Sequence, residues 1–382
     1  MYNRVLQQEL LHLAENWSVI SVTGPRQSGK TTLCKMAFPN YHYVNLEDSV
    51  IRAYIEKDIK SYLLAYPNGL IIDEAQYLPE IFSFVQVVVD ENPKLRYILS
   101  GSSDFLLMQN ISQSLAGRVA VKRLLPLSLE ELVDATQLSA DEIMVRGFYP
   151  AIWGNKKEPY EVYDSYLNTY IQRDVRQIIN IKELSTFQRF ITLCAARIGN
   201  EFVSSSIANE LGVSHVTIKE WLSVMEASYL AFTLQPFFRN VGKRIVKTPK
   251  LYFYDVGLVC YLLGINSPDI LSIHPLRGAI FENMVVCDML KDRYNRGKAN
   301  NLFFYRDKSQ REVDVVQQDG LNLYAYEIKS ALRYHPDFSN NLNYFRQLYG
   351  EQVVSTKIVL SGNEELPMQY NGFINFRHIP KI

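Results

Sequence analysis

The chain has 382 residues, of which 47% are hydrophobic and 21% are charged. This composition excludes disordered and fibrous proteins and indicates two or three globular domains. Its 40 basic and 40 acidic residues cancel, so no net field attracts nucleic acid or an anionic membrane, and any such binding must come from a local patch.

The N-terminal segment, MYNRVLQQELLHLAEN, is amphipathic and polar. It lacks the apolar core and small-residue cleavage site of a signal peptide, and no segment approaches about 18 consecutive apolar residues. Four cysteines lie far apart without CxxC or metal-ligand spacing, which indicates reduced thiols. We therefore expect a cytoplasmic protein that has no membrane partner.

A phosphate-binding loop is predicted near the N-terminus. The run 17–23 is short, β-branched and largely apolar, which favours a buried strand. Every fixed position of G-x-x-x-x-G-K-[ST] is then filled. The residues are Gly24, Pro25, Arg26, Gln27, Ser28, Gly29, Lys30 and Thr31, with Thr32 continuing into a predicted helix.

The residue types explain the chemistry of this loop. Glycines let backbone N–H groups turn inward to hold phosphate oxygens, and a helix N-terminus adds partial positive charge. We expect Lys30 to reach the β and γ phosphates of ATP and Thr31 to bind Mg²⁺. The alternative is a glycine-rich turn before a helix.

Two further strands end in polar residues. The apolar run 70–72 leads into Asp73 and Glu74, the form of a Walker B element. We expect Asp73 to bind Mg²⁺ directly or through water and Glu74 to polarise the attacking water. The run 95–99 ends at Ser100 and further serines, which can contact the γ-phosphate or the water as a sensor does. The alternative is the N-cap of a helix, and both roles can hold together.

The segments GPRQSGKTT, LIIDEAQ, LSGSS and SLAGRV, in this order, resemble the AAA+ ATPase domain of a prokaryotic family whose members carry a C-terminal domain of unknown function. The resemblance covers nearly the whole chain and implies an α/β fold with the parallel sheet of P-loop NTPases, and ATP and Mg²⁺ as cofactors. It also implies that Arg118 is an arginine finger or sensor, which as a finger requires a homo-oligomer. A surface or ion-paired arginine is the alternative.

After an ATPase core over residues 1–127, Ser128 followed by acidic residues predicts the start of a helix. We expect this helix to open a helical lid over 128–184. A winged helix is predicted over 185–265, because helical patterns at 204–211 and 215–222 flank a Gly-Val-Ser turn.

The hairpin expected after these helices is rich in basic residues. Arg239, Lys243, Arg244, Lys247 and Lys250 fall within twelve residues. Such a wing is suited to DNA phosphates and would bind in a salt-dependent way with little sequence specificity. A solvated hairpin or a contact with protein is the alternative.

Residues 266–382 form the last predicted domain. Glu282 lies on a predicted helix, Asp314 on a strand, and Glu327 and Lys329 share one face of the next strand. This order resembles the PD-(D/E)XK core of restriction-endonuclease-like α/β domains, which implies that the carboxylates hold Mg²⁺ and Lys329 orients water. Val313 replaces the usual proline, and an active nuclease, a degenerate nucleic-acid-binding domain and a structural unit all remain open.

Two functions fit these patterns. The first is an AAA+ ATPase that binds and hydrolyses ATP with Mg²⁺ and acts on, or is regulated by, nucleic acid. The second is a nucleotide-controlled switch that binds a protein partner and turns over slowly. DNA should accelerate hydrolysis in the first case and leave it unchanged in the second.

Overall fold

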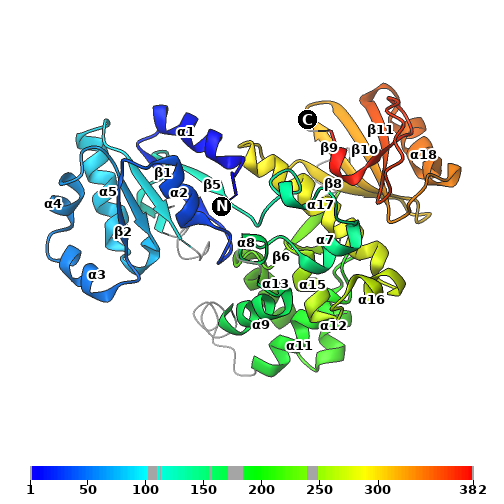
Figure 1. Ribbon diagram of the computed structural model, residues 1–382, viewed down its shortest axis with the longest axis horizontal. Coiled ribbons are helices and arrows are strands. Elements are labelled where there is room, and N and C mark those ends of the chain that lie inside the picture. Colours follow the sequence, from blue (N-terminus) through cyan, green and yellow to red (C-terminus); the bar gives the residue numbers. More distant parts are fainter. Residues whose placement is uncertain are drawn as a thin grey trace.

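The computed structural model describes residues 2–101, 110, 111, 113–154, 157–170, 184–238 and 248–380. An N-terminal α/β unit and a C-terminal α/β unit are joined by a mostly helical middle part (Figure 1). No helix within these ranges is long and apolar enough to cross a bilayer.

The N-terminal unit alternates helices and strands. Its elements are α1 (Leu6–Asn16), β1 (Val19–Thr23), α2 (Lys30–Ala37), β2 (His42–Asn45), α3 (Ser49–Glu56), α4 (Ile59–Leu64), β3 (Leu70–Asp73), η1 (Ala75–Tyr77), α5 (Glu80–Glu91), β4 (Tyr97–Ser100) and β5 (Val119–Arg123). The five strands form a parallel sheet in the order β2-β3-β4-β1-β5. The strands predicted at 17–23, 70–73 and 95–99 are confirmed within two residues.

Both faces of this sheet are covered, as a parallel sheet requires. On one face, Val19 and Ile72 pack with residues of α4 and α5. On the other, Ile20 and Ile71 pack with residues of α1 and α2. Successive strand residues point to opposite faces. Each continuous apolar run therefore contributes side chains to the hydrophobic cores on both faces of the sheet.

The middle part carries most of the helices. Its elements are η2 (Val133–Ala135), α7 (Ala140–Arg146), α8 (Pro150–Gly154), α9 (Pro159–Tyr170), α11 (Leu184–Ala195), α12 (Ser204–Leu211), α13 (His215–Ala227), β6 (Ala231–Pro236), β7 (Lys250–Phe253), α15 (Val256–Leu262) and α16 (Pro268–Ile273). The helices predicted at 204–211 and 215–222 are α12 and α13, and the antiparallel pair β6–β7 follows them.

The helix start predicted at Ser128 is wrong. Turns follow Ser128, and the first α-helix of the middle part begins at Ala140, behind a capping box made by Ser139 and Glu142. Glu131 does bind the backbone N–H of Ser128, yet its buried carboxylate also accepts from Val5 and pairs with Arg4. These contacts with the N-terminal segment hold residues 128–131 in turns.

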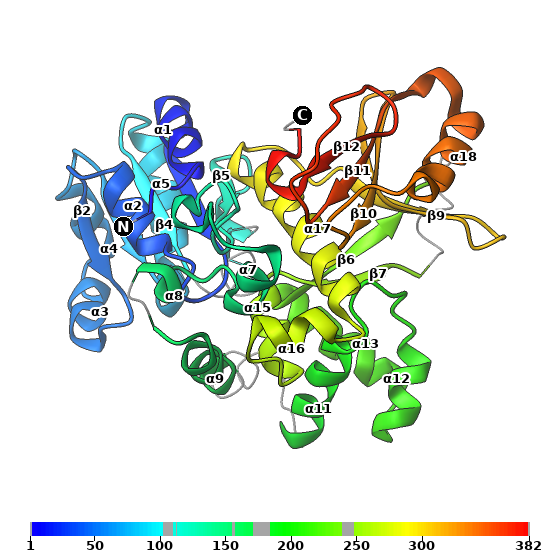
Figure 2. The same cartoon turned by 45° about the vertical axis from the view of Figure 1, so that its right-hand side comes forward.

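The C-terminal unit is built on a long helix and a mixed sheet. Its elements are α17 (Arg277–Asn295), β8 (Leu302–Arg306), β9 (Glu312–Asp319), β10 (Asn322–Lys329), η4 (Pro336–Ser339), α18 (Asn340–Tyr349), η5 (Gly350–Gln352), β11 (Val353–Leu360), β12 (Gly372–Asn375) and η6 (Phe376–His378). The sheet has seven strands in the order β12-β11-β10-β9-β8-β6-β7. The strands β6 and β7 therefore extend the C-terminal sheet (Figure 2).

The predicted border between residues 265 and 266 divides strands of one sheet. The parallel pairing of β6 with β8 joins Gln235 to Phe303 and Pro236 to Phe304, and a single hydrophobic cluster runs from Leu125 to Phe376. The helix α17 contacts α1, β5, β7 and β10, so it touches all three parts of the chain. The division into four domains remains a prediction.

Candidate functional site

The loop between β1 and α2 has the backbone of a phosphate cradle. Gly24 has φ +144°, and a Cβ there would lie 2.1 Å from the carbonyl oxygen of Leu124. Gly29 has φ +95° and immediately precedes the first residue of α2, Lys30. Both positions need glycine because L side chains rarely adopt these φ values. The loop thereby ends at a helix N-terminus, where N–H groups without intrahelical partners face an anion.

Lys30 is buried inside this loop. Its Nζ donates hydrogen bonds to the carbonyl oxygens of Gly24 and Pro25, at 2.9 and 2.8 Å. Burial lowers the pKa of Lys30 to about 8, against the opposing effect of the Glu74 and Asp73 carboxylates. The ammonium is therefore held where phosphate oxygens can replace two carbonyl oxygens as its acceptors.

Asp73, the last residue of β3, is the centre of the polar contacts. Its Oδ2 accepts from Thr31 Oγ1 at 2.6 Å and from the Tyr43 hydroxyl at 3.0 Å, and its Oδ1 accepts from Ser100 Oγ at 2.5 Å. The side chains come from three neighbouring parallel strands and α2, because the carboxyl ends of those strands meet at one edge. Nothing in the local sequence indicates Tyr43, because its contact with Asp73 depends on the order of the strands.

Glu74 follows directly and turns away from the strand. Its backbone is left-handed, with φ 51° and ψ 46°, which ends β3 sharply. Its Oε2 accepts a hydrogen bond from Gln76 Nε2 at 2.5 Å. Glu74 is one of the residues that line the cavity beside the loop.

That cavity has a volume of about 790 Å³, within the range of small-molecule sites. Residues far from the loop in sequence form its other walls, and sequence reasoning missed them. They come from the N-terminal segment and the middle part: Tyr2, Arg4, Leu127, Pro150, Ala151, Gly154, Lys157 and Thr169.

Arg4 ties the loop to the rest of the protein. It is only 7% exposed. One guanidinium nitrogen donates to the carbonyl oxygen of Ser28 and another to that of Leu125, both at 2.7 Å. Its Nε lies 3.0 Å from Oε1 of Glu131, whose side chain is fully buried. The loop is thus held by a buried ion pair that no sequence motif indicates.

Arg118 makes a different contact. Its Nε and one terminal nitrogen donate to the two carboxylate oxygens of Asp90, at 2.7 and 2.9 Å, and the hydrogen bonds with Asp90 raise the pKa of its guanidinium. Arg118 does not line the cavity of its own chain. This geometry is the ion-paired alternative, and a role as a finger in a second subunit stays a prediction.

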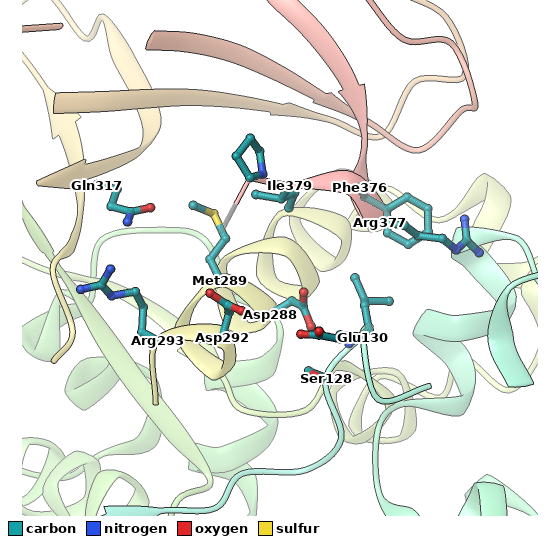
Figure 3. Close-up of a pocket in the computed structure, with 12 residues that line it drawn as sticks. Ser128, Glu130, Asp288, Met289, Asp292, Arg293, Gln317, Phe376, Arg377 and Ile379 are labelled. Atoms are coloured by element: carbon teal, nitrogen blue, oxygen red, sulfur yellow. The ribbon is translucent and has the colours of Figure 1, made fainter. Parts of the chain in front are cut away.

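A second cavity, between Ser128–Glu130, α17 and residues 376–380, has a volume of about 40 Å³ (Figure 3). This space is far too small for a nucleotide. The cavity beside residues 24–31 is the candidate nucleotide site because the phosphate-binding loop lines it.

The comparisons with known proteins agree with this geometry. Residues 16–133 match the model of an AAA domain, and residues 137–269 and 277–379 match two domains of unknown function, DUF8612 and DUF4143. The uncharacterized protein Rv2008c of Mycobacterium tuberculosis is 30% identical over 362 residues, which cover 92% of this chain and 78% of that protein. The chain belongs to the same family. It contains an AAA domain at residues 16–133, which supports an ATP-binding ATPase.

Two more distant similarities accompany this match. An uncharacterized protein of Haemophilus influenzae is 19% identical over 388 residues, covering 92% of each chain. The Walker-type ATPase PABY2304 of Pyrococcus abyssi is similar in structure, with a TM-score of 0.47 and 14% identity, over 68% of this chain and 94% of that one.

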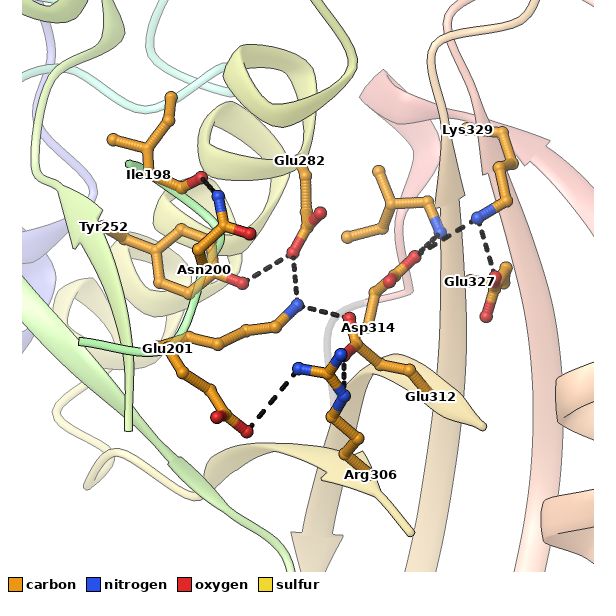
Figure 4. A network of polar contacts seen from close by, with 12 residues as sticks. Ile198, Asn200, Glu201, Tyr252, Glu282, Arg306, Glu312, Asp314, Glu327 and Lys329 are labelled. Atoms are coloured by element: carbon orange, nitrogen blue, oxygen red, sulfur yellow. Dashed lines mark hydrogen bonds and ion pairs between the residues drawn. The ribbon is translucent and has the colours of Figure 1, made fainter. Parts of the chain in front are cut away.

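The C-terminal unit contains the carboxylates that the sequence predicted there (Figure 4). Lys329 Nζ donates to Glu327 Oε1 at 2.7 Å and lies 3.8 Å from Asp314 Oδ2. Asp314 Oδ2 accepts from the backbone N–H of Ile328 at 2.6 Å. Burial, followed by the nearby Asp314 carboxylate, raises the pKa of Glu327 to about 8. The three predicted residues therefore do meet.

Glu282, the fourth predicted residue, has other partners. Its Oε1 accepts from Lys250 Nζ at 3.1 Å and from the Tyr252 hydroxyl at 2.6 Å. Among the residues that the structure describes, no group of three His, Cys, Asp or Glu side chains has an arrangement that could hold a metal ion.

Lys250 corrects one sequence prediction. It was expected in the basic wing, but it is only 2% exposed and also donates to Glu312 Oε1 at 2.5 Å. Lys250 is therefore a buried counter-ion and takes no part in a DNA-facing surface. The other four wing residues, Arg239, Lys243, Arg244 and Lys247, lie outside the described residues.

Proposed function

We propose that this protein hydrolyses ATP with Mg²⁺ at the loop between β1 and α2. The observation that carries the proposal is the convergence of Ser100 and Thr31 on Asp73, next to a nucleotide-sized cavity that Thr31 lines. A hydroxyl and a carboxylate are hard oxygen ligands of the kind that Mg²⁺ accepts. The residues present therefore fit a Mg²⁺–ATP complex.

Each side chain then has one task. The backbone N–H groups of residues 25–29 and the N-terminus of α2 bind the phosphate oxygens. Lys30 exchanges its two carbonyl acceptors for oxygens of the β and γ phosphates. Thr31 and Asp73 would hold Mg²⁺, which would neutralise charge that develops on the phosphates.

Glu74 acts on the water. Its carboxylate takes a proton as the water oxygen bonds to the γ-phosphorus and the bond from that phosphorus to the β–γ bridging oxygen breaks. Ser100, which donates to Asp73, orients that carboxylate and senses the γ-phosphate. Arg118 is proposed as a finger that enters the site of a neighbouring subunit in a homo-oligomer, which requires release of Asp90.

We further propose that ATP hydrolysis by this protein acts on, or is regulated by, nucleic acid. Its support is the basic sequence around Arg239, Lys243, Arg244 and Lys247, in a unit proposed to be a winged helix at residues 185–265. The C-terminal unit from residue 266 is proposed to keep the nuclease-like arrangement as a degenerate form. The ATPase core is taken as 1–127 and the lid as 128–184.

A nucleotide-controlled switch is the second candidate, and one contact favours it. The hydroxyl of Thr23, the residue before the loop, lies 2.7 Å from the hydroxyl of Tyr229 in a buried hydrogen bond. Tyr229 follows α13 by two residues and has φ +58°. A change at the loop is thereby connected to the predicted winged helix without any need for DNA.

Steady-state ATP turnover, with and without duplex DNA, tests the proposal. The wild-type chain should hydrolyse ATP only with Mg²⁺. Lys30→Ala should abolish turnover, whereas Glu74→Gln should bind ATP normally and lose about 10²- to 10⁴-fold in rate. Full turnover by Glu74→Gln would remove Glu74 from the mechanism. Stimulation by DNA that disappears at high salt supports the nucleic-acid role, and indifference to DNA supports the switch.

A further inference from the structure

The carboxylate cluster of the C-terminal unit already contains a cation. Lys250 and Tyr252 are two residues apart on β7, so both side chains leave the same face of the strand. Both donate to one oxygen, Oε1 of Glu282 on α17, and Lys250 also donates to Oε1 of Glu312 on β9. The ammonium thereby bridges two carboxylates that come from different elements.

The site is built for this ammonium. The Lys250 side chain is 3% exposed, and those of Glu282 and Glu312 are 16% and 23% exposed. Burial alone would lower the pKa of Lys250, but the carboxylates of Glu282, Glu312 and Asp314 together outweigh it and raise that pKa. Lys250 therefore stays charged, and a buried charge with two carboxylate partners is strongly held in place.

Within the described part of the chain, no three carboxylates of this cluster are arranged to hold a metal ion. A carboxylate oxygen has two lone pairs, and both acceptor positions of Glu282 Oε1 are used by Lys250 and Tyr252. Asp314 Oδ2 accepts from Ile328, and Glu327 Oε1 accepts from Lys329. One buried oxygen of the cluster, Glu327 Oε2, has no hydrogen-bond partner, but Mg²⁺ takes about six oxygen ligands.

We propose that Lys250 is the resident cation of this cluster and occupies the position that a divalent ion needs next to Glu282. The C-terminal unit consequently takes up neither Mg²⁺ nor Mn²⁺ and does not cleave nucleic acid by a metal-dependent route. The nuclease-like arrangement persists as an ion-paired contact between β7, α17 and β9.

Binding of Mn²⁺ to the full chain, measured by electron paramagnetic resonance without nucleotide, tests this inference. Every variant carries Asp73→Ala, which removes the proposed metal ligand of the ATP site. The chain with Lys250 intact should show no Mn²⁺ site that depends on Glu282 or Asp314. Lys250→Met should gain a single Mn²⁺ site, and adding Glu282→Gln should abolish it.

Two results would overturn the proposal. One is Mn²⁺ binding to the chain with Lys250 intact that is lost in Asp314→Asn, since this shows that the lysine does not block the cluster. The other is folded Lys250→Met that gains no Mn²⁺ site. If Lys250→Met does not fold, the comparison of the Lys250-containing chain with its Asp314→Asn variant still decides the question.

Discussion

The buried pair of Arg4 and Glu131 gives the sharpest prediction about what holds the nucleotide loop. Arg4→Met keeps an apolar stem of similar length but removes two charge-assisted hydrogen bonds, to Ser28 and Leu125. It also leaves the carboxylate of Glu131, which is fully buried, without its counter-ion. Breaking a buried pair by removing one partner costs about 3–5 kcal/mol.

The lower half of that range is expected here. Glu131 retains two backbone donors, Val5 and Ser128, after the substitution, which reduces the cost of its buried charge. We expect Arg4→Met to lower the free energy of opening of the ATPase core by about 3–4 kcal/mol. Since about 1.4 kcal/mol is a factor of ten, amide hydrogens of β1 and α2 should exchange roughly 10²- to 10³-fold faster.

Hydrogen exchange followed by mass spectrometry measures this change peptide by peptide, so a chain of several units needs no two-state assumption. Arg333→Met is the matched control, because the Arg333 side chain is 87% exposed and its pair with Glu364 spans 3.6 Å; its effect should stay below about 0.5 kcal/mol. The double variant Arg4→Met with Glu131→Gln should cost less than the sum of the two single changes. A cost under about 1 kcal/mol for Arg4→Met, or strict additivity in the double variant, would refute this reasoning.

Two further predictions concern ATP and its effect on the chain. ATP favours the charged form of Lys30, whose pKa in the free protein is lowered to about 8. The affinity for ATP should therefore be constant below about pH 8 and fall up to tenfold per pH unit above it. Calorimetry should find an affinity that does not change with pH for Lys30→Arg, and the same result for the wild-type chain would contradict the role of Lys30. Tyr229→Phe removes the hydrogen bond to Thr23 at a cost of about 1 kcal/mol and should abolish ATP-dependent changes in hydrogen exchange at α13. The control is Tyr97→Phe, which loses a buried hydrogen bond to Leu63; an unchanged ATP response in Tyr229→Phe would contradict the coupling.

The nucleotide loop could be predicted from the sequence because its requirements are local. Gly24 and Gly29 are needed for their own φ values, and Lys30 and Thr31 follow from the turn into α2. The meeting of Thr31 with Asp73 also followed, since two strands that precede such loops end at one edge of a parallel sheet. Tyr43 could not be predicted, because its contact with Asp73 requires β2 to lie next to β3.

Arg4 was missed for a related reason. Its partners lie 24, 121 and 127 residues away in sequence, and the segment that contains it, Tyr2 to Val5, has no periodic pattern. A sequence pattern predicts that a residue is buried only when the residues around it form a periodic apolar pattern. A single buried arginine before a helix therefore looks the same as an exposed one.

Lys250 shows the same limit of local sequence patterns, because it was predicted to be exposed and is buried. The basic residues before it in the chain predicted an exposed wing, yet all four residues of β7 are buried. The signal that favoured burial was the apolar run Leu251, Tyr252 and Phe253 that follows the lysine. A charge enters such a strand only when opposite charges meet it, and these are Glu282 and Glu312, 32 and 62 residues further along. Whether a lysine binds phosphate or pairs with buried carboxylates is thus decided by tertiary packing, which brings Glu282 of α17 and Glu312 of β9 to Lys250 on β7.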